Sequence, residues 1–147
     1  MEHMAVLKQI GLFQGLDSME LVQVSKLVKH KRFKAGDIVL KDGEPGSSLF
    51  VVKKGEFRAF LGQGLNSAEV ALFQSGASFG EVALLDHGPR SASVEAVTDG
   101  ELLEFDVQAF QTLMAHSDDM KIKLLTNIST DLVTKLRRTN DTLALLL

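Results

Sequence analysis

The apolar positions at the start of the chain follow a helical spacing. Apolar residues recur through 4–16, where glycines interrupt the run, so we expect short helices or turns. Asp17 and Glu20 stand three residues apart ahead of an apolar stripe over 21–28, and this spacing is typical of a capping box at a helix start. The charged run at 29–32 is expected to end that helix.

A different pattern occupies residues 33–106, in which short apolar runs alternate with turns that carry glycine. Six to eight short strands at this spacing are typical of a sandwich, a jelly roll or a barrel. Residues 80–85 interrupt the pattern, because good helix formers follow a glycine there, and they predict one helical turn. The runs that we expect to be strands are Ile38–Leu40, Leu49–Val52, Phe57–Leu61, Val70–Phe73, Ser91–Val97 and Leu102–Phe105.

Helical spacing returns after residue 106, first in a short helix that begins at Val107. Ser117 and the two aspartates after it are good capping residues for a second helix, which should reach about Asn140. Two interpretations of its apolar stripe stay open: packing on the chain's own β core, or a two-helix homodimer seam. The stripe consists of Leu125, Ile128, Leu132, Leu136, Thr139, Leu143 and Leu146.

The composition is that of one globular domain. The 147 residues are 45% hydrophobic and 24% charged, which argues against disorder. A net charge of −3 gives no basic footprint for nucleic acid, and the absence of cysteine excludes disulfides and cysteine nucleophiles.

No apolar run is long enough for a transmembrane segment, so we expect a cytoplasmic protein. Its expected parts are an N-terminal helical segment at 1–32, a β core at 33–106 and C-terminal helices at 107–147.

The residues around the predicted helical turn suggest an anion site. A helix start after Gly80 would present backbone amides, and Arg90 suits bidentate contact with a phosphate. Ser91 and Ala92 could add a hydroxyl and an amide. Glu81 would repel the same anion unless it faces a sugar hydroxyl, so the set suggests a nucleotide sugar. The plainer alternative is a salt bridge between the glutamate and the arginine across a loop.

Two segments resemble the signatures of a known family. Residues 79–94, which read Phe-Gly-Glu-Val-Ala-Leu-Leu and, further on, Pro-Arg-Ser-Ala-Ser-Val, resemble the phosphate-binding cassette of cyclic nucleotide-binding domains. Residues 39–55 resemble the family's first signature, with its Gly-Glu-x-Gly turn. Such domains occur in catabolite activator protein, in regulatory subunits of cyclic-AMP-dependent protein kinase and in cyclic-nucleotide-gated channels.

The resemblance implies a fold and a binding site. The fold would be mainly β with flanking helices (α+β): a β jelly roll, or double-stranded β-helix, with N-terminal helices and a long C-terminal helix. Arg90 would pair with the cyclic phosphate, and Glu81 would accept from the ribose 2′-hydroxyl. Glycines of the first signature, among them Gly46, would be turn residues without ligand contact. The ligand-binding residues would be Gly80, Glu81, Val82, Ala83, Pro89, Arg90, Ser91 and Ala92.

The resemblance also implies a lid, because family members often cap the base with a residue from the last helix. The sequence has no tryptophan or tyrosine that could stack on the base. The candidates for the capping residue are therefore Leu136, Arg137, Thr139 and Asn140. Cyclic AMP is favoured over cyclic GMP, although a hydroxyl at Ser91 can assist guanine recognition in some members. We expect a non-catalytic signalling sensor without a cofactor, in which ligand closes the C-terminal helix over the pocket.

Three other functions fit the sequence less well. A cupin-like metal enzyme would need clustered ligands, and the four histidines, including His87, show no metal-ligand spacing. Direct DNA binding would need a helix-turn-helix after the long helix, for which few residues remain. A ligand-free dimerisation module of the same fold would have no use for a buried arginine and glutamate. The expected partners are therefore a cyclic nucleotide, a second copy of the chain and an effector protein that the sequence does not identify.

Overall fold

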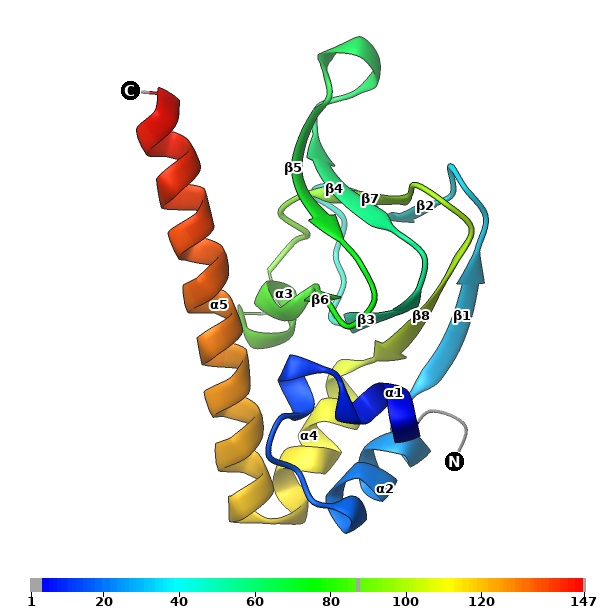
Figure 1. Ribbon diagram of the computed structural model, residues 1–147, viewed down its shortest axis with the longest axis vertical. Coiled ribbons are helices and arrows are strands. Elements are labelled where there is room, and N and C mark those ends of the chain that lie inside the picture. The colour runs from blue at the N-terminus through cyan, green and yellow to red at the C-terminus, as the bar shows by residue number, and fades with distance from the viewer. Residues whose placement is uncertain (1–3, 87, 147) are drawn as a thin grey trace.

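The computed structural model describes residues 4–86 and 88–146 (Figure 1). The strands in this part of the chain are β1 Lys29–Phe33, β2 Ile38–Leu40, β3 Leu49–Lys54, β4 Phe57–Leu61, β5 Ala68–Phe73, β6 Ser78–Phe79, β7 Ser93–Ala96 and β8 Gly100–Phe105. The helices are α1 Met4–Lys8, α2 Ser18–Leu27, α3 Glu81–Asp86, α4 Val107–His116 and α5 Asp118–Leu146, with short 3-10 turns η1 Gly11–Phe13 and η2 Gly64–Asn66.

The strands form two antiparallel sheets of four, which confirms the predicted jelly roll. One sheet has the order β1-β8-β3-β6 and the other β2-β7-β4-β5. Figure 1 shows the α1, α2 and α4 helices gathered at one end of the sandwich, while α5 runs along its side past α3. The connection from β6 through α3 to β7 passes from one sheet to the other, so the cassette residues lie where the two sheets meet.

Alternation along β3 divides the core into two parts. Leu49 and Val51 pack against the helices, whereas Phe50 and Val52 point between the two sheets. All four side chains are at most 5% exposed. A strand that is buried on both faces reads as a continuous apolar run, which explains why the segment shows no polar alternation. The helical layer and the sandwich are therefore joined through the same strand.

The charged run at 29–32 differs from its expected role, because it forms β1 rather than the end of the preceding helix. The helix ends at Leu27, and β1 then pairs with β8 at the sheet edge. Its charges are matched across the pair, with Lys31 Nζ 2.9 Å from Glu104 Oε1 and His30 Nε2 2.7 Å from Glu101 Oε1. An exposed edge strand accepts charged residues, so hydrophobic patterning does not reveal it.

The capping box at the start of α2 is present as predicted. Glu20 N donates to Asp17 Oδ1 at 2.8 Å, and Asp17 N donates to Glu20 Oε1 at 2.9 Å. Lys123 Nζ of α5 lies 2.8 Å from the same Oε1, which ties the capping box to the long helix.

Only the first half of α5 belongs to the core. Met120, Leu124 and Ile128 are at most 1% exposed and pack in the helical layer. Residues 136–146 are exposed throughout, and the helix continues past the expected end at Asn140 to Leu146. Of the predicted stripe, Ile128 is buried and Leu132 packs against the chain's own core, whereas Leu125, Leu136 and Leu143 are exposed. No helix among the described residues is long and apolar enough to cross a membrane.

Candidate functional site

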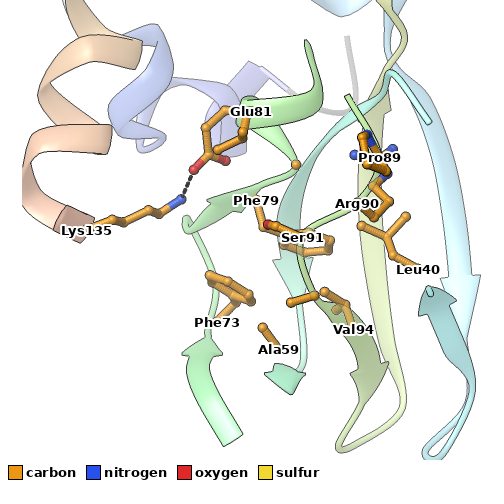
Figure 2. Close-up of a pocket in the computed structure, with 13 residues that line it drawn as sticks. Leu40, Ala59, Phe73, Phe79, Glu81, Pro89, Arg90, Ser91, Val94 and Lys135 are labelled. Carbon is orange, nitrogen blue, oxygen red and sulfur yellow. Dashed lines mark hydrogen bonds and ion pairs between the residues drawn. The ribbon is translucent and has the colours of Figure 1, made fainter. Parts of the chain in front are cut away.

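A cavity of about 140 Å³ lies between the cassette, the β4–β7 sheet and α5 (Figure 2). Its floor is apolar, and there the ring of Phe79 stacks on that of Phe73 with centroids 4.9 Å apart. Its charged lining consists of Arg90, Lys135 and Glu81, two cations and one anion, so the wall carries a net charge of +1. One monoanionic group, such as a phosphodiester, would neutralise it.

The backbone on both sides of Arg90 is held by the turn that follows β2. Arg90 N donates to Glu44 O at 2.9 Å, and Gly43 N donates to Arg90 O at 2.8 Å. The arginine side chain donates from Nη1 to Ser48 O at 3.0 Å, and the residue is only 6% exposed. Burial lowers the pKa of the Arg90 guanidinium, and the Glu104 carboxylate opposes that shift. An arginine stays charged in proteins, so the cavity wall holds a buried cation.

Two glycines make room for this guanidinium. A β-carbon on Gly46 would lie 2.5 Å from Arg90 Nε, and one on Gly80 would lie 2.6 Å from Ser48 O. Gly80 also has a φ of +89°, which side-chain-bearing residues rarely adopt. Gly80 is thus required by its close approach to the backbone, whereas Gly46 leaves room for the arginine side chain, a contact that the expectation of a mere turn residue misses.

Glu81 begins α3 and points at the cavity from the side opposite Arg90 in Figure 2. Its side chain is 6% exposed, and Oε1 lies 2.7 Å from Lys135 Nζ. The second oxygen, Oε2, is buried without a hydrogen-bond partner. A buried carboxylate oxygen without a donor is costly, so this atom is suited to receive a donor from a ligand.

The structure places most of the predicted ligand-binding residues on one cavity. Its lining includes Gly80, Glu81, Val82, Pro89, Arg90, Ser91 and Ala92. The alternative of a salt bridge between Glu81 and Arg90 does not hold, because the glutamate pairs with Lys135 and the arginine with Ser48 O. The side chain of Ala83, and His87 altogether, lie outside what the structure describes.

The candidate base lid does not contact the cavity in this structure. Leu136 is 60% exposed, and Arg137, Thr139 and Asn140 are exposed as well. Lys135, which the sequence reasoning missed, lines the cavity instead. A single lysine among polar residues of a helix carries no recognisable signal in the sequence. Only the packing of α5 shows that position 135 faces the cassette while position 136 turns away.

Within 4–86 and 88–146, no three or more His, Asp or Glu side chains gather closely enough to hold a metal ion.

The two-sheet sandwich thus presents a buried arginine and a buried glutamate on one cavity, an arrangement suited to binding a small ligand. The family model "Cyclic nucleotide-binding domain" matches residues 30–117. The chain therefore belongs to the cyclic nucleotide-binding domain family, as its resemblance indicates.

Individual relatives agree with this assignment. The chain is 34% identical over 108 residues to a cAMP-dependent protein kinase regulatory subunit of Colletotrichum orbiculare, covering 74% of this chain and 27% of that protein. It is 30% identical over 142 residues to a CRP-like cAMP-activated global transcriptional regulator of Mycobacterium tuberculosis, covering 95% and 61%. The structure of Thermus thermophilus catabolite activator protein superposes with a TM-score of 0.80 at 31% identity, covering 92% and 62%. The chain thus spans about a quarter of the kinase subunits that it matches.

Proposed function

We propose that this chain is a non-catalytic sensor that binds a cyclic purine mononucleotide in the cavity between the cassette and α5. The observation that carries the proposal is the unpartnered Glu81 Oε2, buried on the same cavity as the buried Arg90. A cyclic nucleotide offers one negative phosphodiester and one free ribose hydroxyl. These two groups are the complements of a guanidinium and of a carboxylate oxygen.

In this proposal the phosphate lies against Arg90, Ser91 and the backbone near Gly80 and Ala92, while the ribose 2′-hydroxyl donates to Glu81. The cavity of about 140 Å³ is smaller than the roughly 300–1,000 Å³ typical of drug-sized ligand pockets. It suits a phosphate and a sugar, so the purine would lie at its mouth, towards α5. The ligand would then draw the helix over the base, with Leu136, Thr139 and Asn140 as lid candidates.

Cyclic AMP is the favoured ligand of the proposal. The relatives named above are described as cAMP-dependent and cAMP-activated. The Ser91 hydroxyl is compatible with either purine, so cyclic GMP belongs in any test.

The proposal also includes a homodimer formed through α5 and an effector protein that responds to it, acting in the cytoplasm. The support for a dimer is an exposed apolar face on the helix. Leu125, Val133, Leu136 and Leu143 are between 36% and 60% exposed and recur at helical spacing. An apolar face of this kind is stabilised by a second copy of the same helix. The ligand would shift the balance between α5 positions rather than undergo chemistry.

Isothermal titration with cyclic AMP, cyclic GMP and non-cyclic AMP tests the proposal. We expect cyclic AMP to bind most tightly, cyclic GMP more weakly and AMP not at all, and a ligand bound only by the native state also raises the midpoint of thermal unfolding. Absence of binding by every cyclic nucleotide would contradict the sensor and favour a ligand-free dimerisation module. Consumption of the nucleotide during the titration would contradict a non-catalytic role.

A further inference from the structure

Lys135 connects α5 to the sugar end of the proposed site, and three oxygen atoms surround its ammonium group. Nζ lies 2.7 Å from Glu81 Oε1, 2.7 Å from Ser78 O and 2.9 Å from Asp131 Oδ2. An ammonium group has only three donors, so a ligand would compete with the two hydrogen bonds and the ion pair that the lysine already makes. The lysine is therefore placed to act on a ligand through Glu81 and not directly.

The contact fixes which oxygen of Glu81 is free. Lys135 holds Oε1, and Oε2 stays buried without a partner. Figure 2 shows the lysine approaching the carboxylate from the α5 side, away from the part of the cavity that Arg90 lines. A donor from a ligand could thus reach Oε2 while the ion pair stays intact.

The ion pair also answers an electrostatic problem of the site. A buried carboxylate repels a phosphate bound nearby, and the repulsion is strong where water is excluded. Lys135, which also pairs with Asp131, offsets part of the charge of Glu81, so that more of the charge of Arg90 is available to the anion. Without the lysine, the charges on the cavity wall would sum to zero.

We propose that Lys135 is a positioning residue that presents Glu81 Oε2 to the ribose 2′-hydroxyl, so that ligand binding and the docking of α5 strengthen each other. This inference rests on the proposed function. The opposite arrangement is a latch, in which the lysine blocks the glutamate and must leave before ligand enters. The free Oε2 favours cooperation, because the hydroxyl needs no oxygen that Lys135 occupies.

The experiment compares cyclic AMP with 2′-deoxy cyclic AMP, which lacks the hydroxyl, on the full chain and on Lys135→Met. We expect the unmodified protein to prefer cyclic AMP by about ten- to hundredfold, the value of one hydrogen bond to a charged group. In Lys135→Met most of that preference should disappear, while 2′-deoxy cyclic AMP should bind within about threefold of its original affinity. Lys121→Met is the matched control, because Lys121 is an exposed lysine of the same helix, and it should leave both affinities unchanged.

Each other result overturns the inference. Tighter binding of cyclic AMP by Lys135→Met would indicate a latch. Equal losses for both ligands would indicate a direct contact or a merely structural role, and no loss would indicate no role at all.

Thermal unfolding verifies the fold, and Lys135→Gln replaces the methionine variant if that variant does not fold. If the unmodified protein binds neither ligand, the proposed function fails together with this inference, whereas binding with an unchanged preference overturns the inference alone.

Discussion

Gly46 and Arg90 pack so closely that a β-carbon on the glycine would lie 2.5 Å from the arginine Nε. Two residues after the glycine, Ser48 O accepts a hydrogen bond from Nη1 of the same side chain. The loop between β2 and β3 therefore holds the guanidinium of Arg90 in place, although it lies more than 40 residues before the arginine in the chain.

Gly46→Ala should weaken cyclic nucleotide binding and leave the fold intact. The atoms that the new methyl group meets are the end of a flexible side chain, so the guanidinium can move aside at small cost. Its displacement should reduce affinity by about tenfold, the value of one misplaced charge-assisted contact. Calorimetric titration measures the affinity, and Gly11→Ala, where a β-carbon meets nothing within 4 Å, is the control. Unchanged affinity would show that this orientation of Arg90 is not the one that binds.

Arg90→Ala should reduce the affinity for cyclic AMP by about 2–5 kcal/mol, the cost of removing one partner of a desolvated charge pair. Titration calorimetry measures the loss. Arg32→Ala serves as the control, because the Arg32 side chain is 81% exposed on β1. Equal affinities of the Arg90 variant and the unmodified protein would remove the phosphate role from this residue.

Asp106 should stabilise the protein at neutral pH and lose that effect in acid. It caps α4 by accepting a hydrogen bond from Ala109 N at 2.8 Å, and this bond holds the pKa of Asp106 below its ordinary value of 3.8. A carboxyl whose pKa is lower in the folded state stabilises above the unfolded value and loses its effect as pH falls through the folded value. Asp106→Ala should cost about 1 kcal/mol at pH 7, the usual value of a helix N-cap.

Urea denaturation at neutral pH and near pH 3 checks this prediction, since the gap between the two proteins should narrow in acid. The exposed Asp141 of α5, changed to alanine, is the control. A gap of the same size at both pH values would show that the ionised carboxylate is not what stabilises the cap.

The exposed face of α5 should hold the proposed dimer together. Changing Leu136 and Leu143 to aspartate places charge on a face where these side chains are 60% and 52% exposed, so the monomer should keep its fold. Light scattering should report a dimer for the unmodified protein and a monomer for the double variant. A monomeric unmodified protein would contradict the dimer. Truncation near Ser117 would not be a fair test, because it removes the buried Met120, Leu124 and Ile128.

The sequence predicts the sandwich well because its strands alternate with glycine turns that the fold requires. Ile38–Leu40 and Phe57–Leu61 are strands with the predicted bounds. The charged β1 was missed, since its stability depends on Glu101 and Glu104 of a strand far away in the chain. Periodicity along one segment cannot report a partner of that kind.

In the candidate site, too, residues of one local motif could be predicted, whereas residues that packing brings together could not. Gly80, Glu81 and Arg90 belong to one local motif, so their common location on the cavity follows from the sequence. Lys135 and Gly46 come from α5 and from the β2–β3 loop, and their contacts depend on how those elements pack. The helical stripe of α5 could not be divided into its core and exposed parts for the same reason.

The first half of α5 is buried in the core and its second half is exposed, so the exposed half would move as a lever that pivots near Ile128. Beyond that point, Lys135 is the residue through which α5 contacts Glu81 of the cassette. At 1.5 Å per residue, the stretch from Lys135 to Leu146 is about 16 Å long. Measured from the pivot at Ile128, Lys135 lies about 10 Å and Leu146 about 27 Å along the helix. A movement of about 1 Å at Lys135 would thus become one of about 2.5 Å at the end of the helix, given those two lengths.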